Sequence, residues 1–342
     1  MSDKGDFMIH TQKNKRKKSL NTLFNGILER TASTANIGVY AFLIFLFVFF
    51  SILTDGFLSF ANIMNIIRHI AIIGVAAFGE AFVLLTGGID LSIGSIIGLS
   101  GVTAAILVRD LSMAVPLALI CGVLVGTLIG YVNGLIVTKL KIPPIIATLG
   151  TFTIVRGLSN LIAGGMSVFG MPESYRVLGR GYIFFLPLPV LIMMIVFIVL
   201  LIILNKTPFG RYVYAIGSNE RSARISGIKI QKTRNLVFII SGTTAGIAGI
   251  LLSSRLDCGQ ASPINNFELD VITAVVLGGI SIMGGKGKFT GVLIGILIIG
   301  VLENGLILMN VLFYSQMVIK GPVLLFALGL DRLSQHSLRR LE

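Results

Sequence analysis

Long apolar runs separated by short polar segments dominate this chain. A membrane-spanning helix needs about 20 consecutive, mostly apolar residues. The runs predict ten such helices, at residues 34–54, 70–87, 91–108, 111–138, 142–165, 181–205, 235–254, 271–285, 289–303 and 306–330. The second, third, eighth and ninth runs are short or interrupted.

Composition supports this interpretation of the pattern. Of the 342 residues, 54% are apolar and only 13% are charged, whereas a soluble protein carries about 25% charged residues. These values exclude a soluble globular protein and predict an all-α membrane protein. Four of the 40 glycines recur every fourth residue, at Gly122, Gly126, Gly130 and Gly134. This spacing predicts a helix face that packs closely against another helix.

The distribution of charge predicts the topology. The formal net charge is +13, but the basic residues lie in alternate loops and form no nucleic-acid-binding face. If the N-terminus is cytoplasmic, 21 lysines and arginines fall on the inner side and five on the outer side. The positive-inside rule then predicts ten helices with both termini in the cytoplasm.

This topology divides the chain into three parts. Residues 1–33 form a basic cytoplasmic segment, residues 34–330 a polytopic domain with a long cytoplasmic loop at about 206–234, and residues 331–342 a cytoplasmic tail. Two short similarities, Leu85–Ile89 with Leu277–Ile280 and Asn133–Ile136 with Asn304–Ile307, suggest a weak internal inverted repeat.

Polar residues inside the apolar runs are the candidates for a translocation path, because ionisable groups in a membrane usually face the protein interior. They are Glu80, Asp90, Asn133, Thr148, Arg156, Glu303 and Asn304. Asp90 lies in a Gly- and Ser-rich segment between two apolar runs, where it either caps the following helix or lines a polar path. Arg156 either forms an ion pair that joins helices or contacts the solute.

The sequence contains no plausible catalytic, cofactor-binding or metal-binding set. His10, His69 and His336 are scattered, and Cys121 and Cys258 have no metal-like spacing, so buried reduced thiols are expected. The stretch Gly284–Lys288 lacks the pattern of a nucleotide-binding P-loop. If the protein uses ATP, a partner subunit must bind the ATP and its Mg²⁺.

Several motifs follow one another along the chain: Leu85–Ser95, Val132–Gly134, Lys141–Gly150, Gly210–Arg211, Tyr214–Asn219, Glu268–Gly279 and Gly284–Gly287. In this order they resemble the permeases of ABC importers for monosaccharides, of the ribose type. The matches extend from about residue 60 to 330, whereas the N-terminal segment through Asn36 is longer and more basic than the family pattern requires.

The resemblance implies a non-enzymatic transport subunit in the bacterial cytoplasmic membrane, which translocates a ribose-like pentose or a hexose. Its implied partners are cytoplasmic ATP-binding subunits, an external solute-binding protein and a second copy or paralogue of the permease. In the loop 206–234, the resemblance places the contact with the ATPase at Gly217, Ser218, Asn219, Ala223, Gly227 and Ile228. It does not assign individual sugar contacts.

Three alternatives to this function differ in class. The solute could be a furanosyl signal of the autoinducer-2 type, whose permeases share the signature. An ion-coupled secondary transporter would use Glu80, Asp90 and Glu303 as ion sites. A membrane-embedded enzyme lacks support because no acid pair, metal set or nucleophile set is evident.

Overall fold

The computed structural model describes residues 38–262 and 266–339. The chain divides into two units, Met1–Phe45 and Leu46–Glu342. The first contributes only the beginning of an apolar helix, Gly38–Leu53, to the described residues. All contacts reported below lie within the second unit.

The second unit is almost entirely helical. Its elements are α2 (Phe60–Leu85), α3 (Ile93–Arg109), α4 (Val115–Lys139), α5 (Pro144–Ala163), α6 (Glu173–Arg180), β1 (Tyr182–Ile183), β2 (Leu186–Pro187), α7 (Leu188–Lys206), α8 (Pro208–Ser218), α9 (Glu220–Ile225), α10 (Ile230–Leu256), α11 (Phe267–Leu277), η1 (Phe289–Gly291), α12 (Val292–Leu308) and α13 (Phe313–Arg339). The antiparallel pair β1 and β2 connects α6 to α7. Within the described residues, six helices are long and apolar enough to cross a membrane: α2, α4, α5, α7, α10 and the segment Phe289–Leu308.

Each of the ten predicted apolar runs overlaps a helix, although several boundaries differ. α2 begins ten residues before the predicted start, because Ser59 accepts a hydrogen bond from Asn62 N and caps it. The run 271–285 is helical only to Leu277, and four glycines with positive φ follow between residues 279 and 287. The number of helices that cross the membrane, the side of the termini and the inverted repeat stay predictions.

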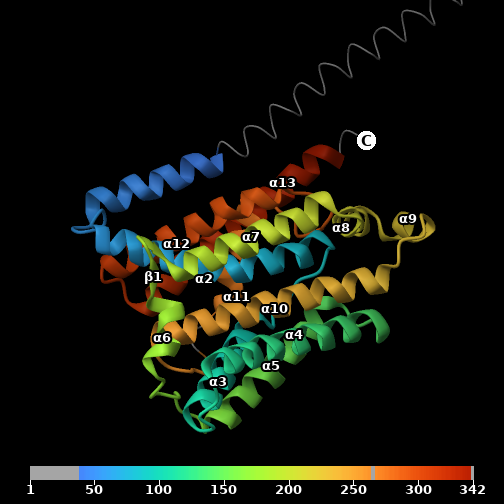
Figure 1. Cartoon of the computed structure of the whole chain (residues 1–342). Coiled ribbons are helices and arrows are strands. Elements are labelled where there is room, and N and C mark those ends of the chain that lie inside the picture. Colours follow the sequence, from blue (N-terminus) through green and yellow to red (C-terminus); the bar gives the residue numbers. More distant parts are fainter. Residues whose placement is uncertain (1–37, 263–265, 340–342) are drawn as a thin grey trace, which may run out of the picture. The chain divides into compact units, whose positions relative to one another are not determined.

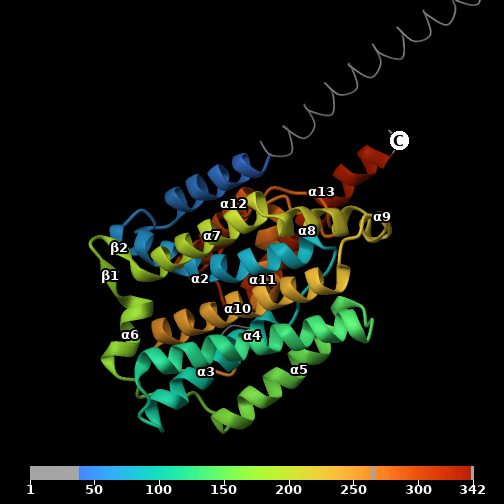
Figure 2. The ribbon, with the colours of Figure 1, turned by 45° about the vertical axis from the view of Figure 1, so that its right-hand side comes forward.

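α10 occupies the centre of this unit and contacts α2, α3 and α4. Figures 1 and 2 show it between α2 on one side and α4 on the other. The four-residue glycine pattern explains the closeness of α4: a Cβ on Gly126 would collide with Gly242 O, and one on Gly130 with Phe238 O. The predicted packing role of this glycine face is therefore confirmed.

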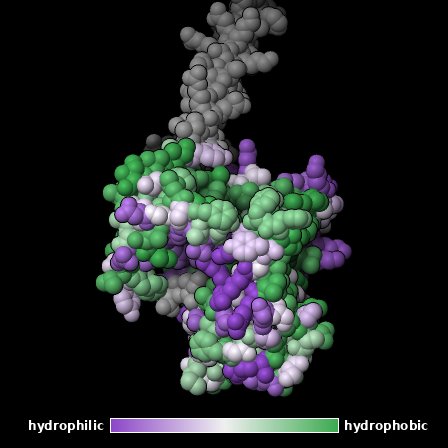
Figure 3. Space-filling model, turned by 60° about the vertical axis from the view of Figure 1, so that its left-hand side comes forward, coloured by the Kyte–Doolittle hydropathy of each residue, from purple (hydrophilic) through white to green (hydrophobic). Residues whose placement is uncertain are grey.

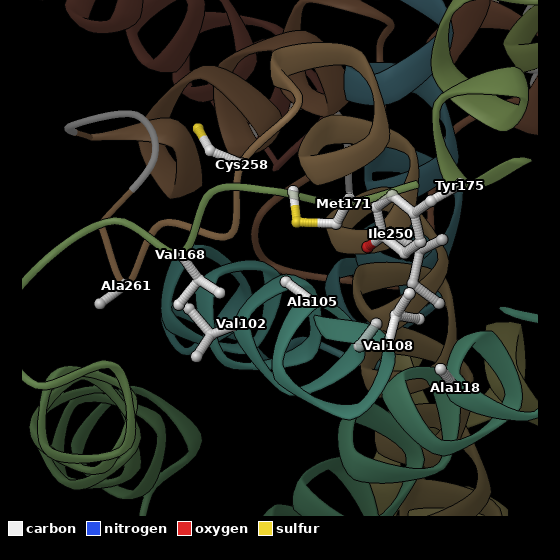
Figure 4. Packing of buried hydrophobic residues seen from close by; sticks show 11 residues of the cluster. Val102, Ala105, Val108, Ala118, Val168, Met171, Tyr175, Ile250, Cys258 and Ala261 are labelled. Atoms are coloured by element: carbon white, nitrogen blue, oxygen red, sulfur yellow. The ribbon is translucent and has the colours of Figure 1, made fainter. Parts of the chain in front are cut away.

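A buried apolar cluster fastens α6 to α3 and α10 (Figure 4). Val102, Ala105 and Val108 of α3 pack here with Ile250 of α10 and Tyr175 of α6. Tyr175 Oη lies 2.6 Å from Ser253 Oγ, and burial raises the pKa of this tyrosine to about 12. The phenol therefore remains a neutral hydrogen-bonding group that anchors α6 on the core.

The outer surfaces of several helices are strongly apolar, as expected for lipid contact. α7 exposes Ile195, Ile198, Val199 and Ile202, and α4 exposes Leu117, Leu124 and Leu128. Figure 3 shows apolar residues on both flanks of one face and a hydrophilic band between them.

Candidate functional site

The segment between α2 and α3 is unwound, and Gly88, Asp90 and Ser92 in it are buried, whereas Gly87 is exposed. Thr86 ends α2 with its hydroxyl bonded to Val83 O at 2.8 Å, and Gly87 has a φ of +76°. Unwound backbone within a membrane needs protein groups to satisfy its N–H and C=O groups. Side chains from four neighbouring helices therefore become important at this point.

Six polar side chains, which we call the polar clamp, hold this segment: Glu80, Asp90, Ser92, Asn133, Thr148 and Ser241. Glu80 Oε1 accepts a hydrogen bond from Asp90 N at 3.1 Å, and Thr148 Oγ1 accepts one from Leu91 N at 3.1 Å. All six members are buried. The clamp thus joins α2, α4, α5 and α10 to residues 90–92.

Asp90 is the centre of the clamp. Its Oδ1 accepts from Ser92 N at 2.9 Å and from Ser92 Oγ at 2.5 Å, and its Oδ2 accepts from Ser241 Oγ at 2.9 Å. Asn133 Nδ2 donates to Ser92 Oγ at 2.8 Å. The N-cap of α3 is Ser92, so Asp90 stabilises the turn ahead of the helix by accepting from Ser92 N and does not cap the helix itself. Its contact with a solute stays a prediction.

The predicted path residues fall into three places. Glu80, Asp90, Asn133 and Thr148 meet in the clamp. Arg156 places its guanidinium 4.7 Å from the Phe152 ring centroid and forms no ion pair with a described carboxylate. Glu303 and Asn304 lie on α12, where Asn304 and Asn62 exchange two amide hydrogen bonds of 2.9 Å.

Glu303 belongs to a second polar group, which we call the charge chain: His69, Arg255, Asp270, Glu303 and Lys320. Its members come from α2, α10, α11, α12 and α13. His69 Nε2 lies 2.7 Å from Glu303 Oε2, and Lys320 Nζ lies 2.8 Å from Asp270 Oδ2 and 3.4 Å from Glu303 Oε1. Arg255 Nη1 lies 3.3 Å from His69 Nδ1. Because arginine can only donate and a carboxylate only accepts, the imidazole carries its proton on Nε2.

Sequence reasoning did not foresee the charge chain. It treated His69 as isolated and left Asp270 within a family motif without a role. The useful signal was Lys320, a lysine inside an apolar run that requires an acidic partner. Across residues 38–262 and 266–339, no three acidic, His or Cys side chains form a metal site.

The loop predicted to contact an ATPase forms the two short helices α8 and α9. Asn219 caps α9 by accepting a hydrogen bond from Ser222 N at 2.9 Å, and Gly227 follows the helix with a φ of +81°. Ala223 packs with Ile216, Ile230 and Ile228. Ile225, in contrast, is 81% exposed at the end of α9.

The end of α8 contacts both unwound segments of the unit through glycines. A Cβ on Gly217 would collide with Leu85 O and Gly285 N, and Gly285 N itself donates to Leu85 O at 2.9 Å. A Cβ on Gly284 would lie 2.7 Å from Gly87 N. We call Gly87, Gly217, Gly284 and Gly285 the glycine junction. It joins α8 to the turn after α2 and to the loop after α11.

Comparison with known proteins identifies the family. The family model "Branched-chain amino acid transport system / permease component" matches residues 62–328. The ribose import permease protein RbsC of Bacillus subtilis is 44% identical over 311 residues, covering 90% of this chain and 94% of that protein. The chain belongs to this permease family.

Other relatives carry different sugars in their names. The L-arabinose transport system permease protein AraH of Escherichia coli is 39% identical to this chain. The match covers 86% of this chain and 89% of AraH. The xylose transport system permease protein XylH of Haemophilus influenzae is 34% identical to this chain. The match covers 87% of this chain and 97% of XylH. No solved structure matches significantly. The protein is thus a multi-pass membrane permease of the sugar-importing ABC type, a transport subunit rather than an enzyme.

Proposed function

We propose that this permease is the membrane subunit of an ATP-driven importer for a monosaccharide, a ribose-like pentose or a hexose, in the bacterial cytoplasmic membrane. The observation that carries the proposal is the 44% identity to a ribose import permease over 90% of the chain. The arabinose and xylose permeases support the solute class.

The proposed assembly has four kinds of part. Cytoplasmic subunits bind ATP and Mg²⁺, an external protein delivers the solute, and a second copy or paralogue completes the membrane domain. α8 and α9 contact the ATP-binding subunits in this arrangement. Arg221 and Arg224 of α9, and Lys229 just before α10, agree with a cytoplasmic position.

The glycine junction supports a route for coupling. Movement of α8 changes the backbone contacts at Gly217, and these contacts reach the unwound segments on both sides. Because backbone meets backbone without intervening side chains, a displacement of α8 cannot be absorbed by a change of rotamer. ATP-driven movement of α8 therefore favours one arrangement of the two segments over the other.

Uptake by proteoliposomes tests the function. The complex of permease, ATP-binding subunits and solute-binding protein should accumulate labelled ribose, arabinose or xylose when ATP is enclosed, with or without an uncoupler. An ion-coupled transporter would lose uptake on addition of the uncoupler. Purified permease alone should neither hydrolyse ATP nor accumulate sugar.

A branched-chain amino acid is the second candidate solute, because the matched family model carries that description. Leucine and a furanosyl signal of the autoinducer-2 type belong in the same uptake panel. Uptake of either one in place of the monosaccharides would contradict the proposed solute class.

A further inference from the structure

A pocket with polar and apolar lining lies between α11 and α13, apart from the polar clamp. Its polar residues are Asn266, Asp270, Thr273, Gln316 and Lys320, and its other lining residues are Leu269, Phe313, Met317, Gly321 and Leu324. On each helix these residues are separated by three or four positions, so two helix faces oppose each other across the space. Its volume is about 100 Å³, enough for several water molecules.

The lining is unusual for a membrane protein surface. Asp270 is only 6% exposed, and Thr273 and Gln316 are also buried. Polar and charged groups at such positions are costly to bury and usually serve a solute pathway. The outward faces of α4 and α7, in contrast, carry leucine, isoleucine and valine.

The charge chain fixes the polar wall of the pocket. Lys320 bonds to Asp270 and Glu303, and Glu303 bonds to His69. A lysine ammonium has three N–H donors, and these two described carboxylates engage two of them. Asp270 and Lys320 together contribute no net charge, so their paired arrangement does not select an ion of either sign.

The remaining groups suit a neutral, polyhydroxylated ligand. Thr273 Oγ1 donates to Leu269 O at 2.6 Å and retains lone pairs that accept hydrogen bonds. Gln316 Nε2 donates to Val311 O at 2.8 Å, which fixes the orientation of its amide. Phe313, which is 43% exposed, offers an apolar surface for the C–H groups of a sugar ring. Donors, acceptors and an aromatic surface therefore occur together.

From this lining we infer that the pocket between α11 and α13 is a solute subsite, which binds part of a monosaccharide during its passage. The inference rests on the proposed function and adds the location of the solute. In this subsite, hydroxyl groups of the sugar bond to Thr273, Gln316 and Lys320, and the C–H groups of its ring contact Phe313.

Removal of one hydroxyl tests the subsite with little change of shape. Thr273→Val should lower uptake of labelled ribose by the reconstituted complex about threefold to tenfold, the effect of one hydrogen bond. Thr138→Val is the matched control, because Thr138 is also buried and donates to the carbonyl four residues earlier, Gly134 O, at 2.6 Å. Equal uptake by both variants would overturn the assignment.

A cysteine in the pocket provides a readout that removes no polar group. A Cβ on Gly321 meets no atom within 4 Å, so Gly321→Cys fits without strain. Cys121→Ala serves as the background, since burial raises the pKa of the Cys258 thiol and keeps it unreactive. Ribose should slow labelling of Gly321→Cys by a small methanethiosulfonate several-fold, in the full complex turning over ATP.

Labelling and uptake in ribose and in leucine distinguish failure of the subsite from failure of the proposed function. Unchanged labelling in ribose, with normal ribose uptake by the wild-type complex, would overturn the subsite and leave the proposed function intact. Protection by leucine, with leucine uptake and no ribose uptake, would overturn both. Protection by ribose but not by leucine is the expected result.

Discussion

At the scale of single residues, the polar clamp shows how short side chains stabilise unwound backbone. Serine, threonine, asparagine and aspartate place oxygen or nitrogen close to the main chain, so they reach N–H groups that no helix satisfies. Leu91 N and Ser92 N each obtain a partner this way. Glu80 reaches further, from the last part of α2, to the N–H of Asp90.

Substitution of Asp90 separates structural from solute-binding roles. Asp90→Asn should assemble normally, because an amide oxygen still accepts from Ser92 and the amide nitrogen can donate to Ser241 Oγ. Asp90→Ala leaves several buried groups without partners and should destabilise the protein by about 1–3 kcal/mol for each. Thermal unfolding in detergent measures both variants. Loss of uptake by a fully assembled Asp90→Asn would show that the negative charge itself is needed.

The glycine junction gives the second prediction at this scale. Gly217→Ala should allow membrane insertion but abolish the link between ATP hydrolysis and uptake, because the added methyl collides with Leu85 O and Gly285 N. The number of ATP molecules hydrolysed per sugar taken up by the reconstituted complex measures this link. Gly329→Ala is the control, since a Cβ there meets no atom within 4 Å. If Gly217→Ala transports with wild-type stoichiometry, the junction is not the coupling route.

At the scale of elements, α9 is a short helix that Asn219 caps. Most of its side chains are exposed to solvent in the described chain. Glu220 bonds to Arg224 at 2.8 Å and to Arg234 at 2.9 Å, which attaches α9 to the start of α10. Ile225 remains exposed beside this ion-pair group. An exposed isoleucine on this short helix is suited to a pocket on a partner subunit.

Ile225 therefore provides a cleaner test of docking than Gly227, whose positive φ makes any side chain there strained. Ile225→Asp should reduce stimulated ATPase activity and co-purification of the ATP-binding subunits, while Ile225→Val should retain both. Pull-down and ATPase assays check this. Full stimulation by Ile225→Asp would place the contact elsewhere.

The exposed surface of α5 mixes large apolar side chains with small and polar ones. Ile146, Ile154 and Leu161 are exposed there, beside Gly150, Thr153, Gly157 and Asn160. Small and polar residues on an outward face fit contact with another protein better than contact with lipid. This element is accordingly our candidate for the contact with a second permease copy.

Cysteine crosslinking tests that contact. Gly157→Cys in the Cys121→Ala background should form a disulfide-linked dimer on mild oxidation, because a Cβ at residue 157 meets no atom within 4 Å in one copy. Ile198→Cys on the exposed face of α7 is the control and should remain monomeric. Non-reducing gels give the readout, and equal crosslinking of both variants would contradict the assignment of α5.

At the scale of the whole molecule, the sequence predicts the helices better than their contacts. Apolar runs locate each helix, since the bilayer fixes its length and composition. The run 271–285 conceals the unwound loop after Leu277, because Ile280, Ile282 and Met283 continue the apolar composition beyond the end of the helix. Glu80, Asp90, Asn133 and Thr148 were identifiable as polar residues in apolar surroundings. Their meeting in one clamp, and the pairing of His69 with Glu303 across 234 positions, depends on tertiary packing.

The polar clamp has a consequence for the synthesis and membrane insertion of the protein. Asp90 and Ser241 are separated by 151 positions in the chain. At about 5–20 residues per second, a ribosome completes that interval in roughly 8–30 s. During this time the aspartate has entered the membrane without its serine partner. The hairpin of α2 and α3 must therefore stay sheltered by the insertion machinery, or remain water-accessible, until α10 is synthesised.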